Sequence, residues 1–246
     1  MRVLVFSDIH ANLVALETVL AHAGPVDAYW FLGDAVGYGP EPNAVLERLR
    51  ALPHCVCLLG NHDAAVVDRL PLGWFNLDAQ RALQWTRHVL TDDNRAFLQG
   101  LEPWQVQGEV LLAHGSPRDP LEEYLLSEDA ARASFRRLAQ PYAFIGHSHI
   151  PLAWVQRAPD QVELVRPRAQ DYGRPFALPA TKTILNPGSV GQPRDGDPRA
   201  AYAVYDSIQG TWTWHRIAYD IDAAIARFYQ VPALPPRFAL RLREGS

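Results

Sequence analysis

The chain has 246 residues, of which 48% are hydrophobic, and a formal net charge of −4. This length supports one sizeable α/β domain or two small ones with a large buried core. Because acidic and basic residues are interspersed along the chain, no basic surface is expected to hold an extended nucleic acid by counterion release. A short phosphodiester is not excluded.

The N-terminal residues 1–6 lack the charged leader and apolar stretch of a secretion signal, and no apolar run approaches ~18 residues. We therefore expect a cytoplasmic protein without a membrane partner. The only cysteines, Cys55 and Cys57, alternate along an apparent strand, so their side chains should share one face. Two cysteines are too few for a disulfide framework or a zinc site, and we expect them to be small buried hydrophobic residues.

The first part of the chain alternates predicted strands and helices. Strands are expected at 2–6, 29–32, 55–59, 110–113 and 142–145, and helices at 13–20 after the cap Asn12, at 43–52 and at 127–139. Elements of this length in alternation imply right-handed β-α-β crossovers and a sheet covered by helices on both faces.

The middle and late parts of the chain have different patterns. Residues 77–101 are expected to be helical with a break near Thr91, which can cap a second helix. Short alternating segments, expected to be antiparallel strands of a second sheet, lie at 152–155, 162–165, 183–185, 201–205 and 211–216. A late helix is expected at 220–230. No linker is visible, so we predict a single domain over 1–246 with a helical cover at about 77–101.

Polar side chains that can bind metal follow the carboxyl ends of five predicted strands. They are Asp8 and His10, Asp34, Asn61 and His62, His114, and His147 and His149. In open α/β sheets this edge is where sites are built, because the loops there converge on rigid strands. Oxygen and imidazole ligands without thiolate suit Mn²⁺, Fe²⁺, Zn²⁺ or Ni²⁺, and their number exceeds what one ion needs. Two ions are the economical explanation.

Each of these residues alone has a simpler interpretation. Asp8, Asp34 and Asn61 would singly be read as caps or turn residues. His147 and His149 would singly be read as surface or core histidines. The joint pattern favours a site, and a carboxylate shared between two ions would hold them about 3.5–4 Å apart, where they can activate a bridging water.

The ordered motifs Asp8-Ile9-His10, Gly33-Asp34, Gly60-Asn61-His62-Asp63, His114 and Gly146-His147-Ser148-His149 resemble the motif series of the calcineurin-like metallophosphoesterases, in their small bacterial phosphodiesterase-type branch. The segment Asn186-Pro187-Gly188-Ser189-Val190 resembles a loop that follows the last ligand motif in the small bacterial members. The resemblance implies an α/β fold, a four-layer α-β-β-α sandwich of two mixed β-sheets flanked by helices.

The resemblance also implies residue roles. Asp8, His10 and His149 would hold one ion, Asn61, His114 and His147 the other, and Asp34 would bridge them. His62 would meet the substrate phosphate together with Asn61 and protonate the leaving oxygen, a contribution of ~10²–10⁴ in rate. The implied cofactor is a pair of divalent ions, Mn²⁺ first, with Fe, Zn or Ni as alternatives. Asp63 is expected to cap a helix or to orient His62.

One departure from the superfamily concerns arginines. Its phosphoprotein phosphatases carry arginines beside the second and third motifs, whereas this chain has Ala35 to Pro40 after the second motif and Leu58-Leu59 before the third. We expect Arg118 and Arg194, in later loops, to bind substrate instead. The segment 37–40 is expected to be a flexible loop on the substrate side.

These observations predict an enzyme that hydrolyses small phosphate esters, phosphodiesters preferred, by attack of a metal-bridging hydroxide on phosphorus. The first alternative is a phosphomonoesterase that acts on a phosphoprotein or a nucleotide. The second is a non-catalytic scaffold with the same fold, which the complete ligand set disfavours. A nuclease is opposed by the charge balance. The sequence leaves the natural substrate and the oligomeric state open.

Overall fold

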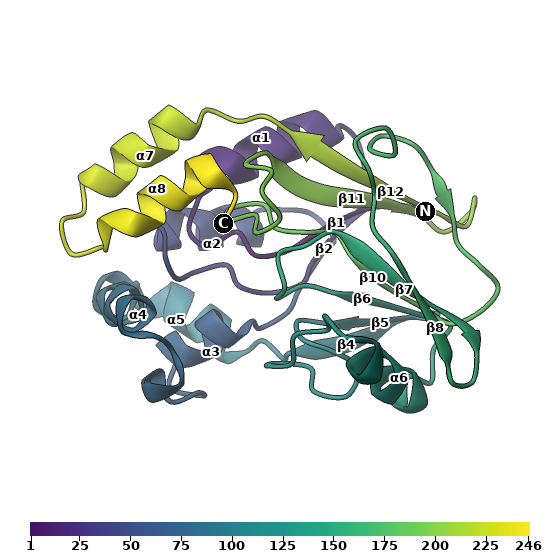
Figure 1. Cartoon of the computed structure of the whole chain (residues 1–246). Helices are drawn as coiled ribbons and strands as arrows, with labels where there is room; N and C mark the ends of the chain where they lie inside the picture. Colours follow the sequence, from purple (N-terminus) through teal and green to yellow (C-terminus); the bar gives the residue numbers. More distant parts are fainter.

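Two mixed sheets packed face to face form the centre of the molecule. The computed structural model describes all of residues 1–246. Sheet A has the strand order β3-β2-β1-β11-β12-β9, and sheet B has the order β4-β5-β6-β10-β7-β8. Helices cover the outer faces of both sheets, which gives the four-layer α-β-β-α arrangement predicted from the motifs (Figure 1).

The elements have the following bounds. The strands are β1 Arg2–Phe6, β2 Ala28–Phe31, β3 Cys55–Cys57, β4 Trp104–Gln107, β5 Val110–Ala113, β6 Tyr142–Ile145, β7 Leu152–Ala158, β8 Gln161–Val165, β9 Phe176–Ala177, β10 Thr183–Asn186, β11 Ala200–Asp206 and β12 Thr211–Ile217. The helices are α1 Leu13–Ala23, α2 Pro42–Arg50, α3 Asn61–Val66, the short 3-10 helix η1 Leu72–Trp74, α4 Leu77–Val89, α5 Asp92–Gln99, α6 Glu128–Arg137, α7 Ile221–Tyr229 and α8 Pro236–Glu244.

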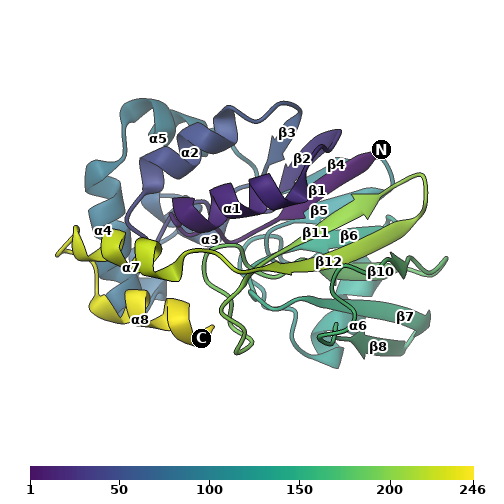
Figure 2. The same cartoon turned by 90° about the horizontal axis from the view of Figure 1, so that it is seen from above.

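Both faces of the central strands are buried, which explains why they read as continuous apolar runs. In β1, Val3 and Val5 join the core between the two sheets. Leu4 and Phe6 point the other way, into the core beneath the helices. Figure 2 shows α1 lying across sheet A above this second core, with α7 beside α1 beyond the ends of the strands. Because successive side chains of a strand point to opposite faces, β1 contributes to both the core between the sheets and the core beneath the helices.

Sheet B is buried in the same manner. Phe144 of β6 lies between the sheets, with its ring centroid 4.6 Å from that of Trp212 and 6.0 Å from that of Trp30. On the other face, Trp154 joins the core that α6 covers through Phe135. Aromatic rings thus fill the space between the sheets and hold the strand ends in fixed positions.

The strands of the second half of the chain do not form a sheet of their own, and that expectation was wrong. β11 joins sheet A antiparallel to β1, whereas β10 joins sheet B parallel to β6 and antiparallel to β7. Each sheet therefore combines strands from the first part of the chain with strands from the second, in parallel and antiparallel pairs. Alternation in a sequence identifies the buried face of a strand but does not reveal which open sheet edge it completes.

The predicted helices of the first half and their caps are confirmed. The Asn12 side chain accepts a hydrogen bond from the backbone of Ala15 at the start of α1, and Thr91 caps α5 in the same way. Five elements were not predicted, namely α3, η1, β4, β9 and α8. The six residues of α3 are too few to establish a periodicity. Cys55 and Cys57 share one face, with their sulfur atoms 3.5 Å apart, and are half-buried.

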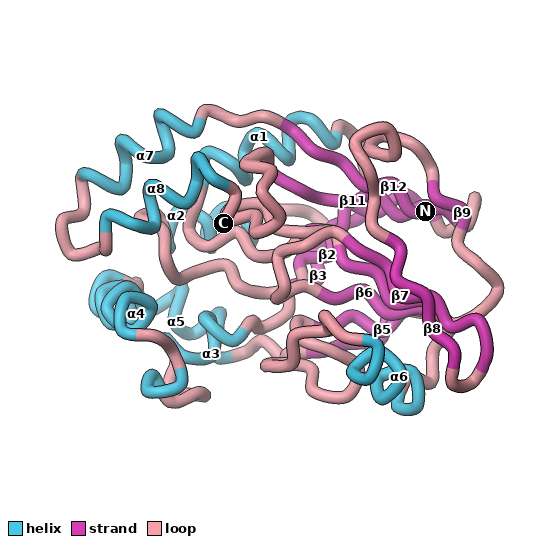
Figure 3. The backbone as a smooth tube through the Cα atoms, in the orientation of Figure 1, coloured by secondary structure: helices cyan, strands magenta, loops and turns pink.

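Several helices gather beyond the carboxyl ends of the central strands (Figure 3). They are α3, α4, α5, α7 and α8. The predicted helical cover corresponds to α4 and α5, and the beginning of α4 contributes Asn76 and Ala79 to a cavity at this end of the molecule. None of the helices is long and apolar enough to cross a membrane.

A single buried carboxylate, Asp63, joins α3 to the turn after β2. Its Oδ2 accepts hydrogen bonds from the backbone N–H groups of Asp34 (2.8 Å), Ala35 (3.2 Å) and Gly60 (3.0 Å), and its Oδ1 accepts one from Val36 (3.0 Å). Asp63 lies in the first turn of α3 and caps this helix through its hydrogen bond with the N–H of Gly60, which is one of the two roles we expected. Its carboxylate makes no hydrogen bond with the imidazole of His62. It fixes the backbone that carries Asp34.

Replacing Asp63 with Ala should destabilise the protein strongly. The substitution leaves four backbone N–H groups without their acceptor, and we expect a loss of about 2–4 kcal/mol in the free energy of unfolding. Urea denaturation measures this loss. The matched control is Asp160→Ala, whose side chain is 83% exposed and pairs only with Arg136. Equal stability of the two variants would contradict the role given to Asp63.

Candidate metal centre

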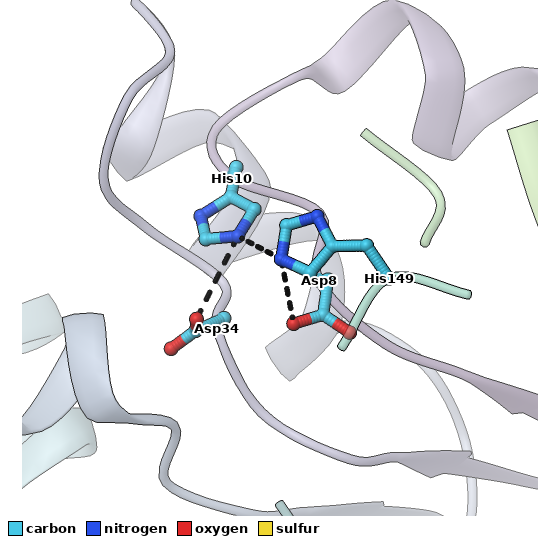
Figure 4. A group of neighbouring side chains, drawn as sticks. All are labelled: Asp8, His10, Asp34 and His149. Carbon is cyan, nitrogen blue, oxygen red and sulfur yellow. Dashed lines mark hydrogen bonds and ion pairs between the residues drawn. The ribbon is translucent and has the colours of Figure 1, made fainter. Parts of the chain in front are cut away.

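The structure brings the candidate ligands together in two groups that share one residue. Asp8, His10, Asp34 and His149 form the first group. Asp34, His114 and His147 form the second. Within each group the potential ligand atoms all lie within 4.8 Å of one another. Figure 4 shows the first group, in which the two carboxylates and two imidazoles turn toward a common space.

Short contacts define the first group. His10 Nε2 lies 3.1 Å from His149 Nε2 and 3.6 Å from Asp34 Oδ2. His149 Nε2 lies 3.3 Å from Asp8 Oδ1. All four side chains are at most 2% exposed. The potential ligand atoms therefore converge where water does not reach them freely.

The second group includes the amide of Asn61. His114 Nε2 lies 3.5 Å from Asp34 Oδ2 and 3.2 Å from Asn61 Oδ1. The rings of His114 and His147 are 4.9 Å apart. Asn61 begins α3, so the end of β3 and the start of this helix together position it. All seven residues predicted as ligands thus lie at one end of the two sheets.

Backbone carbonyls determine which nitrogen of each histidine is free to bind a cation. The pairs are His10 Nδ1 with Val36 O (3.1 Å), His114 Nδ1 with Leu32 O (2.9 Å), His149 Nδ1 with Gln192 O (2.5 Å) and His147 Nε2 with Glu122 O (3.1 Å). A carbonyl oxygen only accepts, so the paired nitrogen of a neutral ring must carry the proton. The other nitrogen then presents a lone pair, as in metal-binding histidines.

The pKa values of three histidines favour the same neutral state, whereas the two carboxyl groups are shifted in opposite directions. Burial lowers the pKa of His10, His147 and His149, so these rings are neutral near neutral pH. Burial raises the pKa of Asp34, and the nearby charges of Asp63 and Asp8 raise it further. Burial acts the same way on Asp8, but His149 and His114 outweigh it and the pKa of Asp8 lies below its usual value.

This arrangement fits divalent cations. The Oδ1 atom of Asp8 is buried and accepts no hydrogen bond, and the lone pairs of His10 and His149 face each other. Buried carboxylate oxygens and opposed lone pairs are unfavourable unless a positive charge lies between them. Carboxylate, amide and imidazole donors without thiolate suit borderline or hard divalent ions.

The backbone is strained at the same residues. Nine non-glycine residues of the chain have a left-handed backbone, and five of them are candidate ligands. The five are Asp8 (φ 55°), His10 (φ 49°), Asp34 (φ 61°), His147 (φ 65°) and His149 (φ 60°). Left-handed conformations are uncommon outside glycine and cluster at functional sites, where the surrounding structure maintains them.

The loop that follows β10 braces two of the ligand loops. Ser189 donates a hydrogen bond from its hydroxyl to the carbonyl of Asp8 (2.8 Å), and the N–H of Gly191 donates to the same carbonyl (3.0 Å). The Asn186 side chain donates to the carbonyl of Gly146 (2.6 Å). The segment 186–190, which resembles a loop of the small bacterial members, thus connects the loop of Asp8 with the loop of His147 and His149.

Glycine permits a close approach at the third motif. A Cβ atom on Gly60 would lie 2.0 Å from Asp34 Oδ1, an impossible contact. The absence of a side chain lets the start of α3 pack against Asp34, whose Oδ1 accepts a hydrogen bond from the N–H of His62 (2.9 Å). Asp34 is thereby held from the side opposite to its neighbouring histidines.

His62 lies beside the centre without joining either group. Its ring is 4.9 Å from that of His10, and its Nδ1 is buried with no hydrogen-bond partner. Burial lowers the pKa of His62 well below its usual value, and the positive charge of Arg194 lowers it further. Its ring lines a cavity that also contacts Asn61 and His147.

The two predicted arginines behave differently. Arg194 donates hydrogen bonds to the hydroxyl of Tyr38 (3.2 Å) and the side chain of Gln192 (3.3 Å), and its Nε is buried without a partner. Its charge acts on His10, His62 and His149. Arg118, in contrast, is largely exposed and bound to Glu123, and the structure does not bring it to the centre.

Sequence analysis missed the tyrosines around Arg194. Tyr38 is 7% exposed and packs against His62 and Phe238, so the segment 37–40 is packed rather than free. Burial lowers the pKa of Arg194, but Tyr38 and Tyr124 outweigh it and that pKa is raised. The only signal in the sequence was the position of Tyr38 directly after the second motif, whereas Tyr124 had none.

Comparisons with known proteins identify the family of the chain. Residues 1–209 match the calcineurin-like phosphoesterase superfamily domain. An uncharacterized protein of Methanocaldococcus jannaschii is 36% identical over 228 residues, which cover 89% of this chain and 88% of that protein. The phosphodiesterase YfcE of Escherichia coli is 26% identical over 217 residues, which cover 84% and 88% of the two chains.

A solved structure agrees with the fold described above. The crystal structure of a metallophosphoesterase from Sphaerobacter thermophilus has 38% sequence identity and a TM-score of 0.90, with 100% of both chains covered. The match extends through both sheets and all the ligand loops. This chain therefore belongs to the calcineurin-like phosphoesterase superfamily and is a phosphoesterase, as its ordered motifs predicted.

Proposed function

We propose that the protein hydrolyses phosphate esters, phosphodiesters before phosphomonoesters, with two divalent ions that share Asp34. The observation that carries this proposal is the position of one carboxylate oxygen. Asp34 Oδ2 lies 3.6 Å from His10 Nε2 and 3.5 Å from His114 Nε2, so a single group reaches both ligand sets. Asp8, His10 and His149 would hold one ion, and Asn61, His114 and His147 would hold the other.

The proposed ions would supply a water nucleophile in its deprotonated form and neutralise charge on the phosphoryl group. We expect Mn²⁺ first, with Fe, Zn or Ni as alternatives, because oxygen and imidazole donors together accommodate all four. The protein's own contribution is to lower the pKa of His10, His147 and His149 and to orient all four ligand histidines. Each ligand histidine donates its second N–H to a carbonyl, so its lone pair is directed before any ion arrives.

His62 and Arg194 would act on the substrate itself. Before substrate binds, the His62 ring is neutral because burial and Arg194 lower its pKa. A bound phosphate anion adds negative charge beside the ring and favours its protonated form, which can then protonate the leaving oxygen. The free Nε of Arg194 would donate to a phosphate oxygen. The Asn61 amide would help to position the same group.

The charge near the site favours a diester. Of the two arginines considered, only Arg194 faces the centre, since Arg118 is bound to Glu123. A phosphodiester carries one negative charge, whereas a phosphomonoester carries about 1.5 to 2 at pH 7. One guanidinium balances the first better than the second. A phosphomonoesterase remains the first alternative, and the presence of His62 beside the full ligand set disfavours a non-catalytic scaffold.

Two variants should separate metal binding from catalysis. Asp34→Ala should lose bound metal and all activity, because both ligand sets depend on this carboxylate. His62→Ala should keep its metal and lose ~10²–10⁴ in kcat, because only a proton donor is removed. Metal content by mass spectrometry and kcat with one diester are measured on the same samples. The control His88→Ala changes an exposed histidine of α4 and should match the unmodified protein.

Full metal content and full activity in Asp34→Ala would refute the shared ligand. Loss of metal from His62→Ala would instead make this histidine a ligand. Either result would require a different assignment of the residues around Asp34.

The substrate preference is tested with two esters that have the same leaving group. Methyl p-nitrophenyl phosphate is a diester, and p-nitrophenyl phosphate is a monoester. With added Mn²⁺, we expect kcat/KM to be higher for the diester. A large preference for the monoester would reverse the proposed order. Hydrolysis of no ester in a broad panel would favour the scaffold, and efficient cleavage of oligonucleotides would favour a nuclease.

A further inference from the structure

A cavity of about 220 Å³ opens directly beside the proposed phosphate position. Its inner wall contains Asn61, His62 and His147. The rest of its lining includes four aromatic side chains, Tyr38, Trp74, Phe75 and Tyr124. Binding sites for whole drug-sized ligands measure about 300–1,000 Å³, so this cavity accommodates one ring system rather than a large molecule.

Two of the aromatic rings are left exposed at the cavity. Trp74 of η1 is 64% exposed, packs against no other aromatic ring and donates no hydrogen bond from its indole. Tyr124 is 48% exposed, and one face of its ring stacks on His147 with centroids 3.8 Å apart and an interplanar angle of 20°. No other aromatic ring packs against Tyr124, so its exposed surface can meet a flat group at the cavity.

The two inner rings contact the proposed proton donor. Phe75 meets His62 edge to face with centroids 5.0 Å apart, and Tyr38 lies 4.4 Å from the same ring. An ester whose phosphate reaches His62 would therefore place its next group between aromatic side chains. Flat π-systems gain about 1–3 kcal/mol per base from such stacking, which aliphatic groups do not.

Polar groups of the lining are also unpaired. The carboxylate of Glu122 makes no hydrogen bond, and the amide nitrogen of Asn76 donates none, since only the Asn76 oxygen is used to cap α4 and to accept from Arg237. The cavity thus offers both an acceptor and a donor to the edge of a ring. This combination of flat walls and polar edges suits a nucleobase better than a phenyl group or an acyl chain.

We infer that this cavity binds the base of a nucleoside whose phosphate lies at the metal centre, so that nucleotide esters are the substrate class. The inference rests on the proposed function, because it takes the phosphate position from the proposed ligands. Trp74 and Tyr124 are the specificity-determining residues. Both come from loops outside the ligand motifs, η1 before α4 and the segment after β5.

The test compares two diesters that differ only in the nucleoside. Thymidine 5′-(p-nitrophenyl phosphate) and methyl p-nitrophenyl phosphate share the reacting phosphorus and the leaving group. We expect kcat/KM to be about 10-fold or more higher for the thymidine ester. Trp74→Ala should lower that ratio about 10-fold, and Trp74→Phe should retain most of it. The control Tyr229→Ala, on the exposed end of α7, should keep the ratio.

A general defect in folding or in the metal centre would lower both esters together and leave the ratio unchanged. Equal kcat/KM for the two esters in the unmodified protein would overturn the inference. A ratio that Trp74→Ala and Tyr124→Ala do not change would overturn it as well.

A binding measurement keeps this inference separate from the proposed function. If neither ester is hydrolysed, the proposed function fails, but the cavity can still be tested by calorimetry with the Mn²⁺-treated protein. Thymidine 5′-monophosphate should bind about 10-fold more tightly than deoxyribose 5-phosphate, and Trp74→Ala should remove the difference. Equal affinity of the two ligands would show that the base is not recognised.

Discussion

Burial of carboxylates without enough positive charge is the constraint on which the site depends. Asp8, Asp34 and Asp63 are each at most 1% exposed. Asp63 is satisfied by four backbone N–H groups, but Asp34 accepts only one and Asp8 Oδ1 accepts none. Burial lowers the pKa of His10, His147 and His149, so these three rings add no positive charge. Divalent cations between these groups would remove the unfavourable energy, so the proposed ions and the folded end of the sheets would stabilise each other.

The rest of the architecture maintains ligands that the local backbone disfavours. Asp8 and His149 keep a left-handed backbone conformation because contacts with neighbouring loops hold them in it. Ser189 and Gly191 hold the carbonyl of Asp8, and Asp63 holds the turn of Asp34. Sheets packed through aromatic rings provide a rigid base for these loops. Backbone strain at the candidate ligands is thus offset by hydrogen bonds that neighbouring residues such as Ser189 and Asp63 make with the same loops.

Sequence reasoning predicted the parts that depend on local pattern. Strand ends followed by Asp, Asn and His marked the loops whose side chains the fold brings together, and caps such as Asn12 marked the helices. It assigned the late strands to one sheet, because alternation carries no information on which edge a strand joins. Arg118 and Arg194 looked alike in sequence, yet only the fold separates an arginine bound to Glu123 from one that faces the site. Trp74 carried no signal, since its meaning comes from its position beside His62.

The central claim is that one carboxylate is shared by two ions. Crystals of the protein grown with Mn²⁺ and measured at an anomalous wavelength test it most directly. The account predicts two anomalous peaks about 3.5–4 Å apart, both within coordination distance of the Asp34 carboxylate. A single peak, or two peaks of which one lies away from Asp34, would contradict it.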